Sequence, residues 1–97
     1  MDLNEKGFVA IKFGASWCAP CKMVSVSFDK MKNEFDSIEF TSVDVDEDPG
    51  LAKKFRIRSV PTVILVRDGQ EVDRLLGSVK IEALRKSLRN LSKEKAA

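Results

Sequence analysis

Apolar residues along this 97-residue chain fall into short blocks whose spacing changes between the periods of strands and helices. The first block, Phe8 to Phe13, is almost continuously apolar, which is typical of a strand covered on both faces. The next block repeats every three or four residues and therefore predicts a helix with one buried face. That face consists of Cys21, Val24, Phe28, Met31 and Phe35.

The middle of the chain predicts a second strand and a short helix. Residues Ile38 to Val45 are expected to form the strand, although their apolar pattern changes phase near Ser42. Asp48 is the expected N-cap of the short helix, which ends near Phe55. Pro49 suits the first helical position because its missing N–H has no partner there in any case.

The last third of the chain predicts a hairpin followed by a closing helix. Thr62 to Val66 is expected to be a strand buried on both faces, and Asp68-Gly69 favours a tight turn into a strand from Glu71 to Leu76. Ser78 is the expected cap of the closing helix, and Lys93 to Ala97 is expected to fray. The core face of this helix is expected to be Ile81, Leu84, Leu88 and Leu91.

This order, βαβαββα, predicts an α/β fold in which helices cover both faces of a mixed sheet, giving three layers, α/β/α. A right-handed crossover makes the first two of its four expected strands parallel. At 97 residues, the chain is expected to form a single domain, residues 1–97. The cysteines then lie just beyond the carboxyl end of the first strand, where open α/β sheets bind ligands.

Composition and charge narrow the function classes. Hydrophobic residues make up 43% of the chain and charged residues 33%, which is typical of a globular protein. The formal net charge is +2 and the basic residues are dispersed, so no nucleic-acid surface is expected. No apolar run approaches the about 20 residues that cross a bilayer, and residues 1–20 lack a leader pattern. We therefore expect a cytoplasmic protein that does not bind membranes.

The chain's two cysteines, Cys18 and Cys21, are separated by two residues at the predicted start of a helix, with Pro20 in its first turn. Unpaired N–H groups and the positive end of the helix dipole favour the thiolate, which is the attacking species in disulfide exchange. Cys21 lies on the apolar stripe and is expected to be buried. Cys18, at the helix start, is expected to meet solvent and substrate. The spacing therefore predicts a reversible dithiol–disulfide pair.

Other roles for the pair remain open at this point. The chain has no histidine, which excludes a Cys/His zinc site within one chain and nucleophilic catalysis assisted by histidine. A static structural disulfide, an idle thiol pair and half of an intermolecular metal site are the alternatives. We expect neither a metal nor a cofactor.

The chain resembles the thioredoxin family from Phe8 to Leu91. An ordered set of motifs carries the resemblance: Trp17-Cys18-Ala19-Pro20-Cys21-Lys22, then Val43-Asp44-Val45-Asp46 with Pro49, then Ile57-Arg58-Ser59-Val60-Pro61-Thr62, then Asp68-Gly69, and finally Gly77. A lone Cys-x-x-Cys would be a weak signal, whereas the ordered set is specific.

The resemblance implies a reductase of protein disulfides in which Cys18 is the nucleophile and Cys21 the resolving cysteine. It also implies a cis peptide bond before Pro61, which faces the cysteines. The implied substrate-binding residues are Trp17, Ala19, Pro20, Val60, Pro61 and Gly77. Disulfide-containing proteins and a recycling enzyme similar to thioredoxin reductase are the implied partners. A disulfide oxidant or isomerase, and a non-catalytic binding module, are the alternatives.

The chain departs from the family pattern in three respects, of which the second involves two positions. Ala19 stands where the family usually has glycine, which is a small change. Lys12 replaces the family's buried aspartate, and Ser42 replaces the lysine that often partners it. Lys12 is therefore a candidate for proton transfer or electrostatic tuning, or its ammonium group simply extends to the sheet edge. The family's first strand and helix have no counterpart, so Ile38 to Val45 is expected to be an exposed edge.

Overall fold

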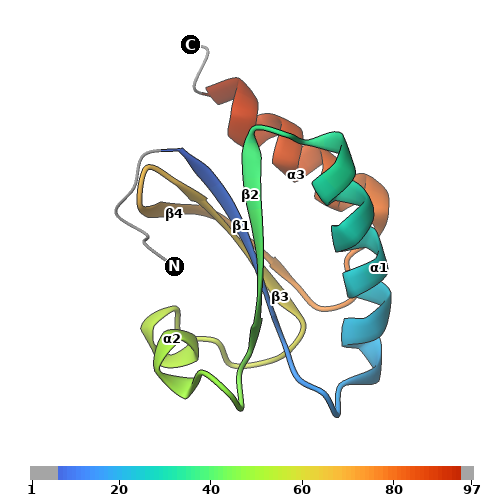
Figure 1. The fold of residues 1–97 in the computed structure, drawn as a ribbon, viewed down its shortest axis with the longest axis vertical. Coiled ribbons are helices and arrows are strands. Elements are labelled where there is room, and N and C mark those ends of the chain that lie inside the picture. Colours follow the sequence, from blue (N-terminus) through green and yellow to red (C-terminus); the bar gives the residue numbers. More distant parts are fainter. Residues whose placement is uncertain (1–6, 95–97) are drawn as a thin grey trace.

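The computed structural model describes residues 7–94, in which strands and helices follow one another in the predicted order (Figure 1). The elements are β1 (Phe8–Gly14), α1 (Ala19–Glu34), β2 (Ile38–Asp44), α2 (Pro49–Lys54), β3 (Thr62–Arg67), β4 (Gln70–Leu76) and α3 (Ile81–Glu94). Each predicted element is present with bounds close to those expected. The predicted fraying concerns Lys93 to Ala97; α3 continues to Glu94, and residues 95–97 lie outside the described part of the chain.

The strands form a mixed four-stranded sheet in the order β2-β1-β3-β4. β1 pairs in parallel with β2, with Phe8 opposite Ile38, as the right-handed crossover predicts. β1 also pairs antiparallel with β3, and β3 continues through its hairpin into β4. Within the described residues, β2 therefore lies at one edge of the sheet, as expected for Ile38 to Val45.

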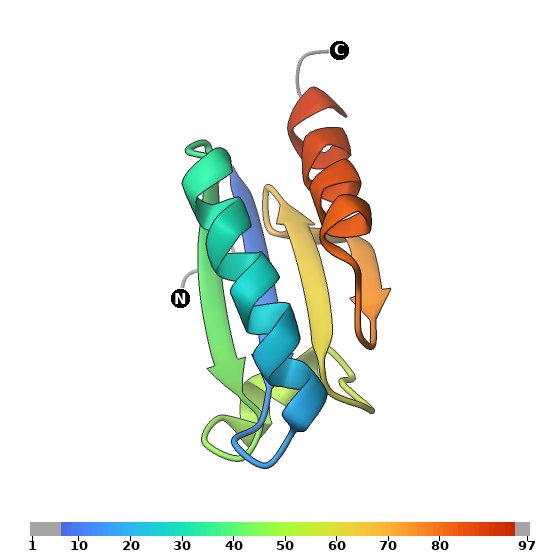
Figure 2. The same cartoon turned by 90° about the vertical axis from the view of Figure 1, so that its right-hand side faces the viewer.

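Two helices cover one face of the sheet, where α1 and α3 lie side by side (Figure 2). The predicted stripes of both helices point into this layer. Its buried members include Val24, Phe28, Met31, Leu84, Leu88 and Leu91, packed on Ala10, Val63 and Leu65 of the sheet. An ion pair of 2.9 Å between Arg85 and Glu34 also joins α3 to the last turn of α1.

The opposite face carries α2, so the sheet lies between two helical layers as predicted (Figure 1). Ile11, Phe13, Ile64 and Val66 are buried on this side. Leu51 and Phe55 of α2 pack against them, and the rings of Phe13 and Phe55 are 5.7 Å apart. Asp48 caps α2 as predicted, because its carboxylate accepts the N–H of Leu51 at 3.0 Å.

The cap predicted for α3 is wrong. The helix begins at Ile81 rather than directly after Ser78, and the carbonyl of Lys80 accepts its first helical hydrogen bond from Leu84 at 3.1 Å. Before it, Gly77 adopts a φ of +78°, and the N–H of Val79 bonds to the Gly77 carbonyl at 2.9 Å. This tight turn uses the residues on which a helix capped by Ser78 would have started.

Candidate active site

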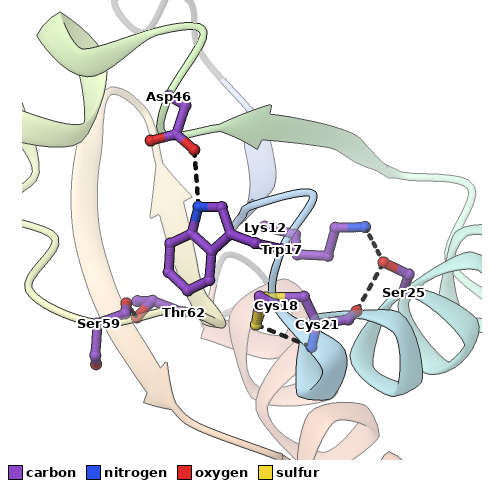
Figure 3. Close-up of a disulfide and its surroundings, with 8 residues drawn as sticks. All are labelled: Lys12, Trp17, Cys18, Cys21, Ser25, Asp46, Ser59 and Thr62. Carbon is purple, nitrogen blue, oxygen red and sulfur yellow. Dashed lines mark hydrogen bonds between the residues drawn. A yellow bond between two sulfur atoms is a disulfide. The ribbon is translucent and has the colours of Figure 1, made fainter.

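The two cysteines lie at the junction between β1 and α1. Cys18 is the N-cap of α1, and the helix continues through Ala19 and Pro20, so Pro20 lies in the first turn as predicted. The cysteines form a disulfide with a Cα–Cα distance of 5.3 Å. The backbone N–H of Cys21 points at Cys18 Sγ from 3.2 Å (Figure 3). A helix N–H and the helix dipole therefore act on Cys18, where they favour a negatively charged sulfur.

The sequence did not predict the burial of Cys18. Cys18 is only 5% exposed and Cys21 is 6% exposed, so the expected difference in exposure is absent from the disulfide form. The reason is local, because the sulfur of Cys18 turns back over the first helical turn toward Cys21. The side chains beside it in the sequence, Trp17 and Ala19, are exposed instead.

Cys21 differs from Cys18 in what surrounds its sulfur. A Cβ placed on Gly14, the last residue of β1, would lie 3.4 Å from Cys21 Sγ. The end of β1 therefore lies directly against the sulfur of Cys21. Cys21 also borders a cleft of about 370 Å³, to which Lys12, Ser25, Ser42, Asp44 and Glu47 contribute among others.

Lys12 lies in this cleft and bonds to the helix that carries the disulfide. Its ammonium group donates to the hydroxyl of Ser25 at 2.5 Å, and Ser25 donates to the carbonyl of Cys21 at 2.9 Å (Figure 3). The ammonium nitrogen also lies 5.5 Å from the centre of the Phe28 ring. Partial burial lowers the pKa of Lys12, and the negative charge of Asp29 opposes this effect.

Trp17 projects from the turn before Cys18 and is 69% exposed. Its indole N–H donates to the carboxylate of Asp46 at 2.8 Å (Figure 3). Asp46 belongs to the turn after β2, where its own N–H bonds to the side chain of Asp44 at 2.8 Å. The exposed indole is thus fixed in orientation by a residue from another element.

The segment before β3 completes the site. The Val60–Pro61 peptide bond is cis, as the resemblance implied, and the Pro61 carbonyl accepts the N–H of Gly77 at 2.9 Å. Val60 borders a cavity of about 160 Å³ together with Trp17, Val45, Ile57, Arg58 and Ser59. The structure thus brings Trp17 and Val60 together. Ala19 and Pro20 are exposed at the start of α1 but do not line this cavity.

Sequence reasoning missed Ser25 and Asp46. Ser25 is four residues after Cys21, one helical turn away, so helical periodicity could have placed it beside the cysteine. Asp46 was noted only as part of a motif. Nothing in the sequence pairs it with Trp17, 29 positions away.

Other features of the described residues bear on the class of protein. No helix between residues 7 and 94 is both long and apolar enough to cross a membrane. In the same range, no cluster of three or more His, Cys, Asp or Glu side chains is arranged to hold a metal ion. The three-layer fold, the Cys-x-x-Cys pair at a helix start and the cis-proline segment together define the thioredoxin-fold class.

Comparisons with known proteins agree. The family model for thioredoxin matches residues 2–90. Thioredoxin H2-1 of Oryza sativa subsp. japonica is 42% identical over 88 residues, covering 91% of this chain, and Thioredoxin H5 of Arabidopsis thaliana is 34% identical over 90 residues, covering 92% of this chain and 76% of that protein. The chain belongs to the thioredoxin family. It spans 63% of the rice relative and 59% of Thioredoxin H2 from Arabidopsis thaliana.

Solved structures of thioredoxins are also similar to this chain in fold and sequence. The oxidised form of mitochondrial thioredoxin 3 from Saccharomyces cerevisiae has a TM-score of 0.84 and 32% identity, covering 91% of this chain and 82% of that one. Thioredoxin from Trypanosoma brucei brucei has a TM-score of 0.86 and 31% identity, covering 94% of this chain and 80% of that one.

Proposed function

We propose that this chain is a thiol–disulfide oxidoreductase that reduces protein disulfides through Cys18 and Cys21. One observation carries the proposal. The sulfur of Cys18 lies at the N-cap of α1, 3.2 Å from the backbone nitrogen of Cys21, and it is disulfide-bonded to the sulfur of the same residue. This position favours the thiolate, and the bonded pair is the oxidised product of the proposed reaction.

The proposed reaction begins with the reduced pair. The Cys18 thiolate attacks one sulfur of a substrate disulfide, forming a mixed disulfide and releasing the first substrate thiolate, which takes up a proton. Cys21 then loses its proton and attacks Cys18 Sγ, so that the Cys18–Cys21 disulfide forms and the second substrate thiol leaves. In total, the protein gives two electrons to the substrate, and the substrate gains two protons, one from Cys21 and one from solvent, because Cys18 begins as the thiolate.

We assign substrate binding to the surface around this pair, within a single domain of residues 1–97. Its proposed members are Trp17, Ala19, Pro20, Val60, Pro61 and Gly77. The shared cavity of Trp17 and Val60 supports this assignment, as does the hydrogen bond of Gly77 to Pro61. An extended substrate segment placed along Val60 would lie beside the exposed indole.

Lys12 is the proposed electrostatic group of the site. Its positive charge, bonded through Ser25 to the first turns of α1, favours thiolate at the cysteine pair. Where Lys12 is neutral, it can accept the proton that Cys21 loses in the resolving step, through the cleft that both residues border. In the family, an acid occupies this position, so the charge acting on the cysteines has the opposite sign.

The proposed cycle requires partners and a reducing compartment. Disulfide-containing proteins are the proposed substrates, and an enzyme similar to thioredoxin reductase restores the dithiol. Because the active pair must be kept reduced, we place the protein in the cytoplasm, where it carries electrons and maintains redox balance. The resemblance to plant H-type thioredoxins supports a role of this general kind.

The deciding experiment is a trapping assay with single cysteine variants. Cys21→Ser should accumulate mixed disulfides through Cys18, whereas Cys18→Ser should abolish reduction of insulin disulfides without trapping partners. Trapping through Cys21 would reverse the assignment. A Cys18–Cys21 potential more oxidising than the glutathione couple would favour an oxidant or isomerase. Full partner binding by a variant lacking both cysteines, with no turnover by the parent, would favour a binding module.

A further inference from the structure

Three arginines converge on a second cleft, which we call the arginine cleft. It has a volume of about 310 Å³ and is lined by Arg56, Arg58, Ser59, Thr62, Arg74 and Leu76. Arg56 and Arg58 belong to the segment between α2 and β3, and Arg74 belongs to β4. The fold thus gathers cationic side chains from two parts of the sequence.

Arg74 has a structural role in this cleft. Its guanidinium binds both carboxylate oxygens of Glu71 at 2.8 Å and the carbonyl of Phe55 at 2.6 Å. It also reaches the carbonyl of Arg56 at 3.5 Å. The hydrogen bonds that Arg74 donates to the Glu71 carboxylate raise the pKa of Arg74, so the guanidinium group stays charged. Arg74 therefore fixes the segment that carries Arg56, and Glu71 balances its charge.

No carboxylate within residues 7–94 pairs with Arg56 or Arg58 in the way that Glu71 pairs with Arg74. Both Arg56 and Arg58 are exposed. Arg56 also holds a left-handed φ of +54°, and its N–H bonds to the carbonyl of Lys53 at 3.0 Å, so its backbone is fixed. Two uncompensated positive charges therefore face one cleft.

The arginine cleft adjoins the proposed substrate surface. Arg58 and Ser59 line both this cleft and the cavity that Trp17 and Val60 share. A substrate segment lying along Val60 would therefore continue past Arg58 into the arginine cleft. Leu76, which is 65% exposed, adds an apolar wall that suits the methylene groups of a glutamate side chain.

We propose that the arginine cleft selects protein substrates with an acidic side chain in the extended segment beside the disulfide. The planar guanidinium groups of Arg56 and Arg58 match a carboxylate in shape and charge. The proposal rests on the proposed function, since it names the substrate class of the same site. The arginines act on substrate recognition and leave the chemistry of the cysteines unchanged.

The experiment uses sets of disulfide peptides that differ at one position beside the reactive cysteine. At each position tested, the set carries glutamate, glutamine or lysine. At low salt, the parent should reduce the best-placed glutamate peptide about two- to fivefold faster in kcat/KM than its glutamine form, which corresponds to an exposed ion pair. Lysine at that position should be the poorest, and salt should shrink all these differences.

Three variants provide the comparison. Arg56→Gln combined with Arg58→Gln should remove the preference for glutamate, whereas Lys86→Gln on the exposed side of α3 should retain it. Arg58→Lys should keep part of the preference, because the charge remains without the planar fork. Thermal unfolding of each variant establishes that it is folded at the assay temperature.

A neutral small substrate, hydroxyethyl disulfide, separates the two proposals. If neither this substrate nor any peptide is reduced, the proposed function fails and the cleft proposal fails with it. If all substrates are reduced but the parent shows no charge preference, or the double arginine variant keeps it, only the arginine cleft proposal is overturned.

Discussion

Lys12 and Ser25 join the first strand to the helix that carries the disulfide, through a hydrogen bond of 2.5 Å from ammonium to hydroxyl. The Ser25 hydroxyl in turn donates a hydrogen bond to the carbonyl of Cys21, which lies one helical turn earlier. The positive charge of a β1 side chain is thereby held against α1, the helix that carries the disulfide. The ammonium group is partly buried, and this loss of hydration lowers the pKa of Lys12.

Replacing Lys12 should make the Cys18–Cys21 couple more reducing. In the proposed role, the charge of Lys12 stabilises thiolate and hence the reduced form, so its loss should shift the equilibrium toward the disulfide. We expect Lys12→Met to lower the potential on the order of 20 mV, equivalent to about 1 kcal/mol, and Lys12→Asp to lower it further. Equilibration against glutathione buffers measures the potential.

Lys30→Met, an exposed change farther along α1, is the control and should leave the potential unchanged. If the potentials of Lys12→Met and Lys12→Asp both equal that of this control, Lys12 does not influence the potential of the cysteine pair and only packs its stem against the sheet.

The same lysine predicts a pH dependence of stability. Because burial lowers the pKa of Lys12 below its usual 10.5, the unfolded chain binds more protons than the folded chain between the lowered value and 10.5. The contribution of Lys12 to stability therefore rises as the pH increases through this window. Lys12→Met should gain stability relative to the parent at pH 7, and this gain should shrink toward pH 10.5.

Urea unfolding at several pH values gives the difference in free energy of unfolding between Lys12→Met and the parent. The contributions of the other titrating groups largely cancel in this difference. Lys30→Met, an exposed change on α1, provides the baseline for this comparison. A Lys12→Met difference that grows with pH would contradict the assigned direction.

The hydrogen bond between Trp17 and Asp46 predicts a selective loss of activity. Asp46→Ala removes the acceptor and frees the exposed indole, so kcat/KM for protein disulfides should fall by about two- to fivefold, the size of one net hydrogen bond. Reduction of hydroxyethyl disulfide should not change. Asp46→Asn keeps an acceptor oxygen and should retain most of the activity.

Fluorescence reports the change directly, since Trp17 is the chain's one tryptophan. Its anisotropy should fall in Asp46→Ala and stay near the parent value in Asp46→Asn. Equal losses for protein and small substrates would instead show that Asp46 acts on the cysteines.

Phe28 should contribute strongly to stability. Its ring is 2% exposed and packs edge-on against Phe40 with ring centres 5.1 Å apart. Phe28→Ala should lower the free energy of unfolding by about 3–5 kcal/mol through lost burial and the cavity left behind. Met23→Ala on the same helix, where the side chain is 74% exposed, should change it by less than about 0.5 kcal/mol. Urea unfolding measures both, and a similar loss for the two would contradict this role.

The elements could be predicted because their signals are local. The apolar stripe of α1 repeats every three or four residues, and Asp48 and Pro49 mark a helix start whatever the rest of the chain does. Ser78 carried a similar signal, but the tight turn at Gly77 moved the start of α3 to Ile81. Local propensity could not reveal this, because Gly77 is also bonded to Pro61 from another segment.

The cysteine pair could be predicted from the sequence, but the arrangement of the side chains around it could not. Motif spacing identified Cys18 and Cys21 but not the burial of Cys18, which depends on how its sulfur turns over the helix. The partners of Lys12 and Trp17 come from other elements, so only the folded chain joins them. The arginine cleft likewise combines β4 with the segment before β3.

The burial of both sulfurs has a kinetic consequence. A thiol diffusing freely in solution meets almost none of the disulfide's surface, so random collisions exchange electrons with it slowly. A partner that docks on the surrounding side chains holds its own thiolate at the sulfur long enough to react. We therefore expect the oxidised pair to react more slowly with free thiols in solution than with the thiolate of a docked partner.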